Sequence, residues 1–393
     1  MDYENKSFED LIRNFCFKMF FFETNTLLNW YFSMLPREFF IEDRLEKYRR
    51  ISSCNLGESG FKNFKLGEIF KLIDLEMEEF KQISLEDSSN RGLEELRLEI
   101  SNLYKNINID EILVTTGTSE ALYIFFRSII NKGDRVGYFS PAFQALYEIP
   151  LLCGAILNPV NILNGKNFEK LFRDSEIIIL NHPHNPTGIT FDEKDWDQIY
   201  FYGKKYERVI LFDEHYRFLD NEVGIGRTGY HSNNTFATGS ITKSFGVTGL
   251  RIGWIVGDKE IISKMRSFKD YLTHTVNPIS EFLALKLLKN RNKVLPNIIS
   301  ILKENQKYFI ENIKFISSLE SMITPTGGLV AFPKLKDGTF SEEYADNLYK
   351  NCDIFVLPGK NFEMEGYIRI GFGETEERFK NGIDRWIKWE KKK

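Results

Sequence analysis

The sequence predicts an α/β fold built on a largely parallel sheet. Short runs rich in Val, Ile, Leu and Phe have the length of buried strands; they are Ile112 to Thr115, Arg135 to Phe139, Glu176 to Leu180, Arg208 to Phe212 and Arg251 to Val256. Amphipathic stretches, such as 119–130 and 192–206, lie between several of these runs. Strands that alternate with helices form a parallel sheet, which binds its ligands beyond the carboxyl ends of the strands.

The domain organisation follows from the length and from a change of pattern near the C-terminus. A chain of 393 residues suggests two or three domains, or a large domain with a smaller one attached. We expect a helical arm in residues 1–60 and a large ligand-binding domain in residues 61–295. A long helical pattern begins near Asn297, and strand-like pieces follow at 328–332 and 367–371. This pattern predicts a smaller α+β domain over residues 296–393.

The composition argues against several classes of protein. The formal net charge of −4 is spread along the chain, whereas nucleic-acid binding needs clustered basic residues. The four cysteines form no CxxC pair, so we expect neither a disulfide framework nor a bound metal. Free thiols and an acidic N-terminus favour the cytoplasm. The aromatic run from Phe15 to Phe22 is interrupted by Lys18 and is too short to span a bilayer, so we expect it to pack on the body or on a partner subunit rather than on a membrane.

A lysine motif follows the strand-like stretch at 235–239. It reads Ser240-Ile-Thr242-Lys243, and Arg251 follows a few residues later. A lysine that forms an imine must be partly deprotonated, and burial lowers its pKa for that purpose. The hydroxyls of Ser240 and Thr242, together with the Arg251 fork, could hold a phosphate beside it. Taken alone, so short a motif is far more often a surface lysine in a turn.

Three further motifs follow strand-like runs. Asp213 and Tyr216 lie in Asp-Glu-His-Tyr, and Asn185 begins Asn-Pro-Thr-Gly, a turn sequence. Gly117-Thr118-Ser119 leads from a strand into a helix, where free N–H groups and the helix dipole attract anions. Each motif alone is also consistent with a plain turn or a helix cap.

Two further residues are candidates for the site only in the context of the other motifs. Phe143 follows Ser-Pro-Ala after a strand, and a single aromatic residue there is more often part of a core. Arg369 lies between Ile368 and Ile370, so strand alternation places it on the opposite face from these two residues. An isolated arginine in a strand is usually a solvated edge residue.

The ordered set of these motifs resembles the class I/II aminotransferases, within fold type I of the pyridoxal-phosphate (PLP) enzymes. The resemblance covers the chain from about residue 50 to its end. It implies a mostly parallel seven-stranded sheet in the large domain, PLP as cofactor, and Lys243 as the residue that forms the Schiff base. It also implies that Asp213 pairs with the pyridine nitrogen and that Tyr216 and Asn185 contact the phenolic oxygen of the cofactor.

The remaining roles follow from the same resemblance. Gly117, Thr118 and Ser119 form the turn that binds the PLP phosphate, and Phe143 stacks on the pyridine ring. Arg369 binds the substrate α-carboxylate, near Asn185. The segment Gly57-Glu58-Ser59-Gly60 resembles the part of the family that passes over the substrate. The family also implies a homodimer in which a second subunit completes the active site.

The sequence departs from the family in two places. Many members carry a tyrosine shortly before the GLxELR helix that reaches the partner's phosphate, but residues 85–97 contain no tyrosine. The contact is therefore missing, or Ser88, Ser89 or Arg91 supplies it. Glu58 is also unusual: it is either solvent-exposed or a carboxylate that recognises a basic substrate.

The favoured function is amino-group transfer from an L-amino acid to a 2-oxo acid. Residues 269–281 and the HPHNPTG and LPGK motifs resemble a natural-product subgroup that includes capreomycidine synthases and PLP-dependent arginine oxidases. The alternative is therefore cyclisation, elimination or oxidation of an arginine-like substrate. The oxidases use an N-terminal histidine, and no histidine precedes His182 here. A regulator with an aminotransferase-like domain is disfavoured, because the first fifty or so residues show no clear helix-turn-helix pattern.

Overall fold

The computed structural model describes residues 35–219 and 234–393. The chain forms two compact units, Met1–Phe39 and Phe40–Lys393, and the account below concerns the second unit. The aromatic stretch around Phe15 to Phe22, expected to pack on the body or on a partner, lies outside the described residues.

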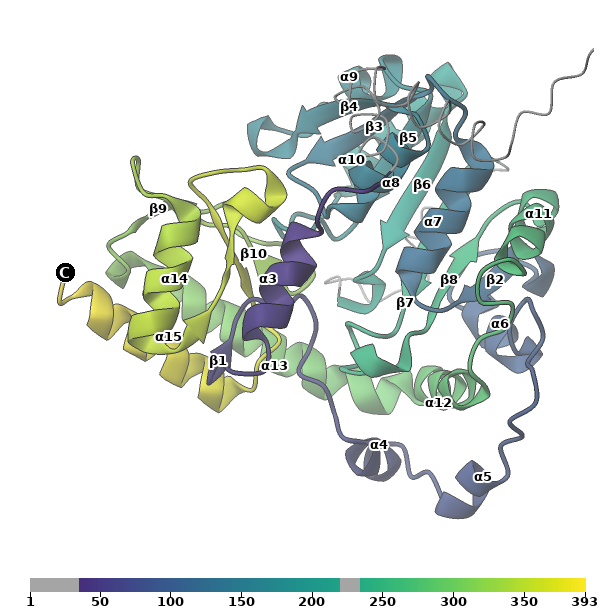
Figure 1. The fold of residues 1–393 in the computed structure, drawn as a ribbon, viewed down its shortest axis with the longest axis horizontal. Coiled ribbons are helices and arrows are strands. Elements are labelled where there is room, and N and C mark those ends of the chain that lie inside the picture. Colours follow the sequence, from purple (N-terminus) through teal and green to yellow (C-terminus); the bar gives the residue numbers. More distant parts are fainter. Residues whose placement is uncertain (1–34, 220–233) are drawn as a thin grey trace, which may run out of the picture. The chain divides into compact units, whose positions relative to one another are not determined.

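A seven-stranded sheet forms the centre of the unit (Figure 1). Its strands, in spatial order, are β2 (Ile112–Thr115), β8 (Gly253–Val256), β7 (Thr235–Ser240), β6 (Val209–Glu214), β5 (Ile177–Asn181), β3 (Arg135–Ser140) and β4 (Ile156–Asn161). Only β8 runs antiparallel to its neighbours in this sheet. The predicted α/β fold with a mostly parallel seven-stranded sheet is therefore confirmed.

Two details of the sheet differ from the sequence prediction. The run that begins at Arg251 enters the sheet only at Gly253, because Arg251 has a left-handed backbone with φ of 52°. Strand β4 was not predicted, because Pro159 interrupts its apolar pattern and Ile156 is 57% exposed. Its position at the sheet edge explains both features, since an edge strand needs fewer backbone donors and has one open side.

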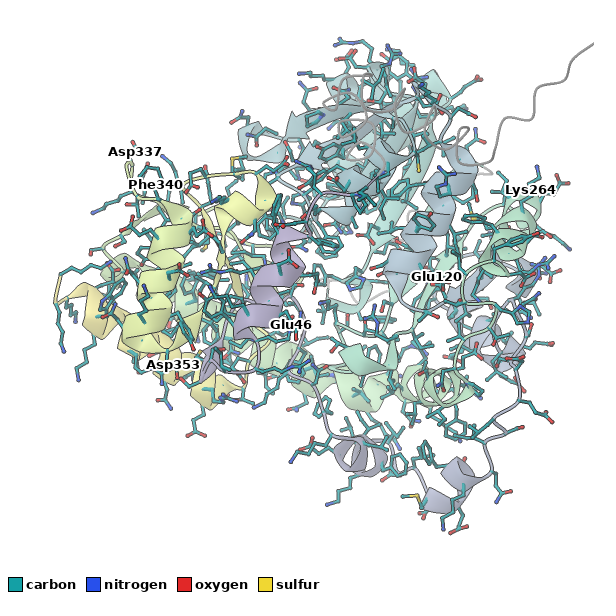
Figure 2. The ribbon with its side chains drawn as sticks, viewed as in Figure 1. Glu46, Glu120, Lys264, Asp337, Phe340 and Asp353 are labelled. Atoms are coloured by element: carbon teal, nitrogen blue, oxygen red, sulfur yellow. The ribbon has the colours of Figure 1, made fainter. Side chains whose placement is uncertain are left out.

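Helices cover the sheet because strands such as β2, β5 and β7 are buried along their whole length. The helices of this region are α4 (Leu66–Leu72), α5 (Met77–Lys81), α6 (Glu94–Ser101), α7 (Thr118–Ile129), α8 (Ala145–Leu152), α9 (Phe168–Arg173), α10 (Glu193–Tyr206), α11 (Lys259–Lys269) and α12 (Pro278–Lys289). Helix α7 packs its apolar face, including Leu122 and Phe125, against β7 and β8. Exposed charges such as Lys264 on α11 point outward (Figure 2).

The C-terminal part begins with the long helix α13 (Arg291–Asn312), which crosses the expected boundary at residue 296 without a break. The elements that follow are β9 (Leu319–Ser321), β10 (Val330–Ala331), β11 (Lys334–Leu335), α14 (Ser341–Cys352), β12 (Ile354–Phe355), β13 (Leu357–Pro358), β14 (Ile368–Gly371) and α15 (Glu376–Glu390). Strand β14 lies between β10 and β13 and is antiparallel to both. The domain boundaries stay predictions.

The N-terminal segment of this unit joins the C-terminal elements. Strand β1 (Cys54–Asn55) pairs in parallel with β12. Helix α3 (Phe40–Tyr48) is fixed by the Arg44 guanidinium, which contacts the Asp346 carboxylate of α14 at 2.5 Å. These contacts hold the segment from Phe40 to Gly60 beside the carboxyl ends of the central strands. Within residues 35–219 and 234–393, no helix is long and apolar enough to cross a membrane, and no cluster of metal-binding side chains occurs.

Candidate active site

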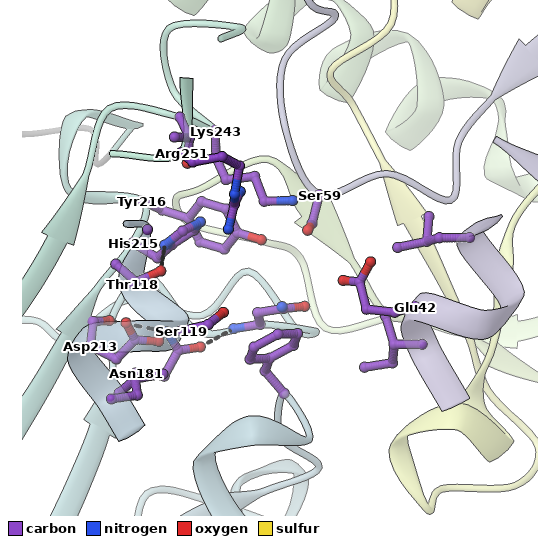
Figure 3. A pocket seen from close by; sticks show the side chains of 17 residues that line it. Glu42, Ser59, Thr118, Ser119, Asn181, Asp213, His215, Tyr216, Lys243 and Arg251 are labelled. Carbon is purple, nitrogen blue, oxygen red and sulfur yellow. Dashed lines mark hydrogen bonds between the residues drawn. The ribbon is translucent and has the colours of Figure 1, made fainter. Parts of the chain in front are cut away.

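One pocket at the carboxyl ends of the central strands collects most of the predicted site residues (Figure 3). Its lining includes Ser59, Gly117, Thr118, Ser119, Phe143, Asn185, Asp213, Tyr216, Thr242, Lys243 and Arg251. Gly60, Ser240, Glu58 and Arg369 adjoin it through neighbours described below. Motifs spread over much of the sequence therefore meet at one place.

Asp213 is the next-to-last residue of strand β6 and is almost fully buried. Its Oδ1 accepts a hydrogen bond from Thr238 Oγ1 at 2.9 Å, and its Oδ2 accepts one from Asn181 Nδ2 at 3.0 Å. Burial raises the pKa of this carboxyl to about 6, against the two hydrogen bonds, which favour the ionised form. The carboxylate is thus held in a fixed orientation and would gain from a cationic partner in the pocket.

The turn between β2 and α7 lets a side chain lie directly against its backbone. Gly117 has φ of 80° and precedes the first residue of α7, Thr118. A Cβ on Gly117 would lie 2.6 Å from Arg251 Nη2, so only glycine lets the guanidinium lie against this turn. The N-terminus of a twelve-residue helix and a guanidinium therefore face the same space.

The lysine motif forms a second wall of the pocket. The Ser240 hydroxyl lies 2.7 Å from the Thr242 hydroxyl and donates to the Ile252 carbonyl at 2.8 Å. Burial lowers the pKa of Lys243, while the carboxylates of Glu58 and Glu42 act in the opposite direction. A lowered pKa makes the neutral amine, which is the nucleophilic form, more available.

The segment after β1 covers Lys243. The Phe61 N–H donates to the Lys243 carbonyl at 2.9 Å, and a Cβ on Gly60 would lie 3.0 Å from Lys243 Cδ. Ser59 is buried and lines the pocket beside Tyr216, whose pKa is raised to about 12 by burial. The tyrosine thus stays protonated across the physiological range and can donate a hydrogen bond.

Arg369 reaches the site from β14 and is 1% exposed. Its Nη1 donates to Asn185 Oδ1 at 2.9 Å, and its Nη2 donates to the Gly57 carbonyl at 2.6 Å. Its Nε is buried and has no hydrogen-bond partner among the described residues. A buried guanidinium with an open donor is suited to bind a carboxylate.

An acidic pair lies at the other end of the pocket. Arg49 Nη2 contacts Glu42 Oε2 at 3.0 Å, and Arg49 Nε contacts Glu58 Oε1 at 3.3 Å. Glu42 lines the pocket from α3, and Figure 3 shows its side chain directed into the cavity. Two carboxylates thus share one arginine near the substrate end of the site.

Sequence reasoning missed several residues of this pocket: Ile41, Glu42 and Leu45 of α3, Leu122 of α7, Asn181 at the end of β5, and His215. Asn181 and His215 carry a detectable signal, because each is a polar residue at or just after the end of a buried strand. The residues of α3 carry none, because their approach depends on packing between α3 and the distant helix α14.

The residues considered as substitutes for the missing tyrosine make contacts within their own chain. The Ser88 hydroxyl donates to the Glu281 carboxylate, and Arg91 Nη1 donates to the Asp110 carbonyl at 2.9 Å. The Ser89 hydroxyl accepts a 3.4 Å contact from the Arg91 N–H. A contact from these residues to a partner's phosphate stays a prediction.

The fold and the pocket define a PLP-dependent enzyme of fold type I. Residues 76–385 match the family model "Aminotransferase class I and II", and the chain belongs to this family.

Named relatives include both transaminases and a cyclising enzyme. Capreomycidine synthase of Streptomyces vinaceus is 24% identical over 354 residues, which are 87% of this chain and 91% of that protein. An aspartate aminotransferase of Pyrococcus horikoshii is 25% identical over 316 residues, which are 75% of this chain and 81% of that protein. The solved structure of the PLP-dependent cyclase OrfR has a TM-score of 0.84 at 21% identity and covers 91% of this chain and 98% of that one. This structural likeness confirms the fold.

Proposed function

We propose that this chain is an aminotransferase that moves the amino group of an L-amino acid to a 2-oxo acid. The observation that carries the proposal is that Lys243 and Asp213 line one pocket and that Arg369 adjoins it through its hydrogen bond to Asn185, which also lines the pocket. These residues supply an amine, a buried carboxylate and a buried guanidinium, which this reaction requires together.

The donor set of the pocket fits PLP. The α7 N-terminus with Gly117, Thr118 and Ser119, together with the Arg251 guanidinium, suits a phosphate dianion. Thr242 lines the pocket beside them, and Ser240, whose hydroxyl donates to the Ile252 carbonyl, would hold Thr242 in place rather than donate to the phosphate itself. Asp213 suits a protonated pyridine nitrogen, because a cationic partner would offset the cost of burying its charge. Lys243 would bond to the aldehyde carbon, Tyr216 and Asn185 would contact the phenolic oxygen, and Phe143 would pack on the ring face.

The bound cofactor supplies an electron sink for negative charge at the substrate Cα. Lys243 would take the proton from Cα and return one at the next carbon, acting first as general base and then as general acid. Burial lowers the pKa of this amine, so the neutral form that takes the proton from Cα is more available than in an exposed lysine. Asp213, whose carboxylate is fixed by hydrogen bonds from Asn181 and Thr238, would pair with the pyridine nitrogen of the ring.

The substrate carboxylate would bind Arg369, whose Nε is the open donor. Asn185 holds the guanidinium from one side, and the Gly57 carbonyl holds it from the other. Ser59 and Gly60 lie over Lys243 and would exclude water from the reacting carbon. Arg369 is thus held in place from two sides by groups of its own chain.

A second candidate function keeps this machinery but diverts the reaction on a basic substrate to cyclisation, elimination or oxidation. The observation that favours it is the Glu42, Arg49 and Glu58 cluster, where a substrate cation could take the place of Arg49. Similarity to capreomycidine synthase supports the same candidate. The aminotransferase stays the first proposal, because the site combines Lys243, Asp213 and Arg369.

We further propose a homodimer in the cytoplasm. Tyr271 and Leu272, in the turn after α11, are 88% and 44% exposed and offer apolar surface for a second copy. The described cysteines Cys54, Cys153 and Cys352 are free thiols, as suits a reducing compartment.

The experiment that tests the cofactor assignment is borohydride reduction followed by peptide mapping. The label should be found on Lys243, and Lys243→Ala should abolish turnover while PLP still binds through its phosphate contacts. A label on another lysine would overturn the assignment.

A further inference from the structure

His215 has a role in this pocket that none of the family motifs assigns. It follows Asp213 by two residues, just beyond the end of β6, and both side chains line the pocket. Glu214 between them points away and pairs with Arg217. The period of two in an extended chain explains this alternation. His215 is therefore part of the cavity wall, between the carboxylate that suits a pyridine nitrogen and the turn that suits a phosphate.

The contacts of His215 connect it to that turn. Its Nδ1 lies 3.0 Å from Thr118 Oγ1. In Figure 3 the ring lies between Thr118 and Arg251. Burial, together with the nearby charges of Lys243 and Arg251, lowers the pKa of His215 to about 3. The imidazole is therefore neutral and carries a single N–H, so the tautomer decides which partner receives it.

The number of hydrogens available limits what Thr118 can do. A threonine hydroxyl donates only one hydrogen bond. If that hydrogen points to His215 Nδ1, Thr118 offers no side-chain donor to an anion at the turn. If Nδ1 carries the proton instead, the imidazole donates to Thr118 Oγ1, and the hydroxyl hydrogen is free. Nδ1 is the nitrogen at Thr118, and the ring lies between Thr118 and Arg251, so the opposite nitrogen, Nε2, is on the Arg251 side (Figure 3). A guanidinium only donates, which favours a lone pair on Nε2 and therefore the proton on Nδ1.

We propose that His215 is a positioning residue of the phosphate turn, whose Nδ1–H donates to Thr118 Oγ1 and so directs the Thr118 hydroxyl hydrogen to a phosphate monoester bound there. This inference rests on the proposed placement of the cofactor phosphate at the α7 N-terminus. The phosphate turn thus gains one hydrogen-bond donor, the Thr118 hydroxyl, from within the same chain. The site lacks the tyrosine that many relatives use to contact the phosphate.

The tautomer can be observed directly. ¹⁵N NMR of the PLP-loaded protein labelled at histidine distinguishes a protonated ring nitrogen from an unprotonated one, and the chain has five histidines. Comparison with His215→Phe assigns the signals. We expect a protonated Nδ1 and an unprotonated Nε2 on His215. The reverse pattern, or a doubly protonated ring, would overturn the proposal.

Cofactor affinity provides the second test. The apoprotein is titrated with PLP, and binding is followed by quenching of protein fluorescence. His215→Phe keeps a ring but no donor, so the Kd should rise about five- to tenfold, as loss of one neutral hydrogen bond implies. His215→Asn, whose amide can occupy the Nδ1 position, should stay within about twofold of the wild type. In a Thr118→Val background, His215→Phe should add little, because the shared hydrogen bond is already absent.

The placement of the phosphate and the role of His215 can be tested separately. Thr118→Val and Arg251→Lys should each weaken PLP binding, whatever residue stands at position 215. If neither does, the proposed placement of the phosphate is wrong. If both do but His215→Phe binds PLP as the wild type does, or if its effect simply adds to that of Thr118→Val, then His215 only packs in the wall and the inference fails.

Discussion

Arg369 Nη1 donates a hydrogen bond of 2.9 Å to Asn185 Oδ1, which joins strand β14 to the loop after strand β5. Asn185 is in turn fixed, because its N–H donates to Asn181 Oδ1 at 2.6 Å, and the Asn181 amide also donates to Asp213. One hydrogen-bonded chain therefore links the proposed carboxylate-binding arginine to the carboxylate proposed to hold the cofactor ring. The substrate and cofactor ends of the site are aligned by the same side chains.

Truncation of Arg369 should impair every amino acid substrate. Loss of one member of a buried, hydrogen-bonded ion pair costs about 2–5 kcal/mol. We expect Arg369→Ala to lower kcat/KM by at least about thirtyfold for all substrates, while the absorbance spectrum of the bound PLP is nearly unchanged. Steady-state kinetics with several amino acids provide the measurement. A loss below about tenfold would show that the α-carboxylate binds elsewhere.

Asp213 should make the stability of the cofactor-free protein depend on pH. The pKa of its carboxyl is raised to about 6 in the folded state from 3.8, so the unfolded chain loses its proton first as the pH rises. The resulting loss of folding stability is absent below the pKa that Asp213 has in the unfolded chain. It reaches its full size above about pH 6.

Asp213→Asn removes this ionisation. From pH 5 to pH 7, the free energy of unfolding of the variant should therefore rise by about 1 kcal/mol relative to that of the wild type. Denaturant titrations of both apoproteins at the two pH values measure the difference. If the two proteins have parallel pH profiles, Asp213 does not carry the shifted pKa.

Glu58 and Glu42 should select for a cationic substrate side chain if the second candidate function holds. L-arginine and L-citrulline form a matched pair of similar shape, of which only arginine is charged. Glu58→Gln and Glu42→Gln should each lower kcat/KM for L-arginine about tenfold more than for L-citrulline, as loss of a charge-assisted hydrogen bond implies.

Glu46→Gln is the control. Glu46 lies on helix α3, as Glu42 does, but it is exposed (Figure 2) and pairs with Arg50. This variant should leave both substrates unchanged. Parallel losses for arginine and citrulline in the pocket variants would exclude recognition of charge at this cluster.

The parts of the site that the sequence predicted are those in which the local sequence determines position. Lys243 and the turn at Gly117 each follow a buried strand, and Asp213 lies near the end of one. The carboxyl ends of parallel strands meet at one edge of a sheet. Glu42 could not be predicted in this way, because its place depends on the Arg44 to Asp346 contact between distant helices. Strand β4 was missed because edge strands tolerate residues such as Pro159 that weaken the pattern.

The proposed homodimer can be tested by sedimentation at the concentration used for assays. Tyr271 and Leu272 are exposed next to each other, and a second copy would cover them. We expect a single species with twice the mass of the 46.1 kDa chain. A fully active monomer would contradict the proposal that a second subunit completes the site.

The most direct test of the central proposal is the amount of 2-oxo acid that the PLP-loaded enzyme releases from its preferred L-amino acid when no 2-oxo acid acceptor is present. In an aminotransferase, the amino group stays on the cofactor after one turnover, and the reaction stops until an acceptor removes it. We therefore expect about one equivalent of 2-oxo acid per active site, and renewed turnover when a 2-oxo acid is added. Sustained turnover without an acceptor, or oxygen consumption with L-arginine, would contradict amino-group transfer and favour the diverted reaction.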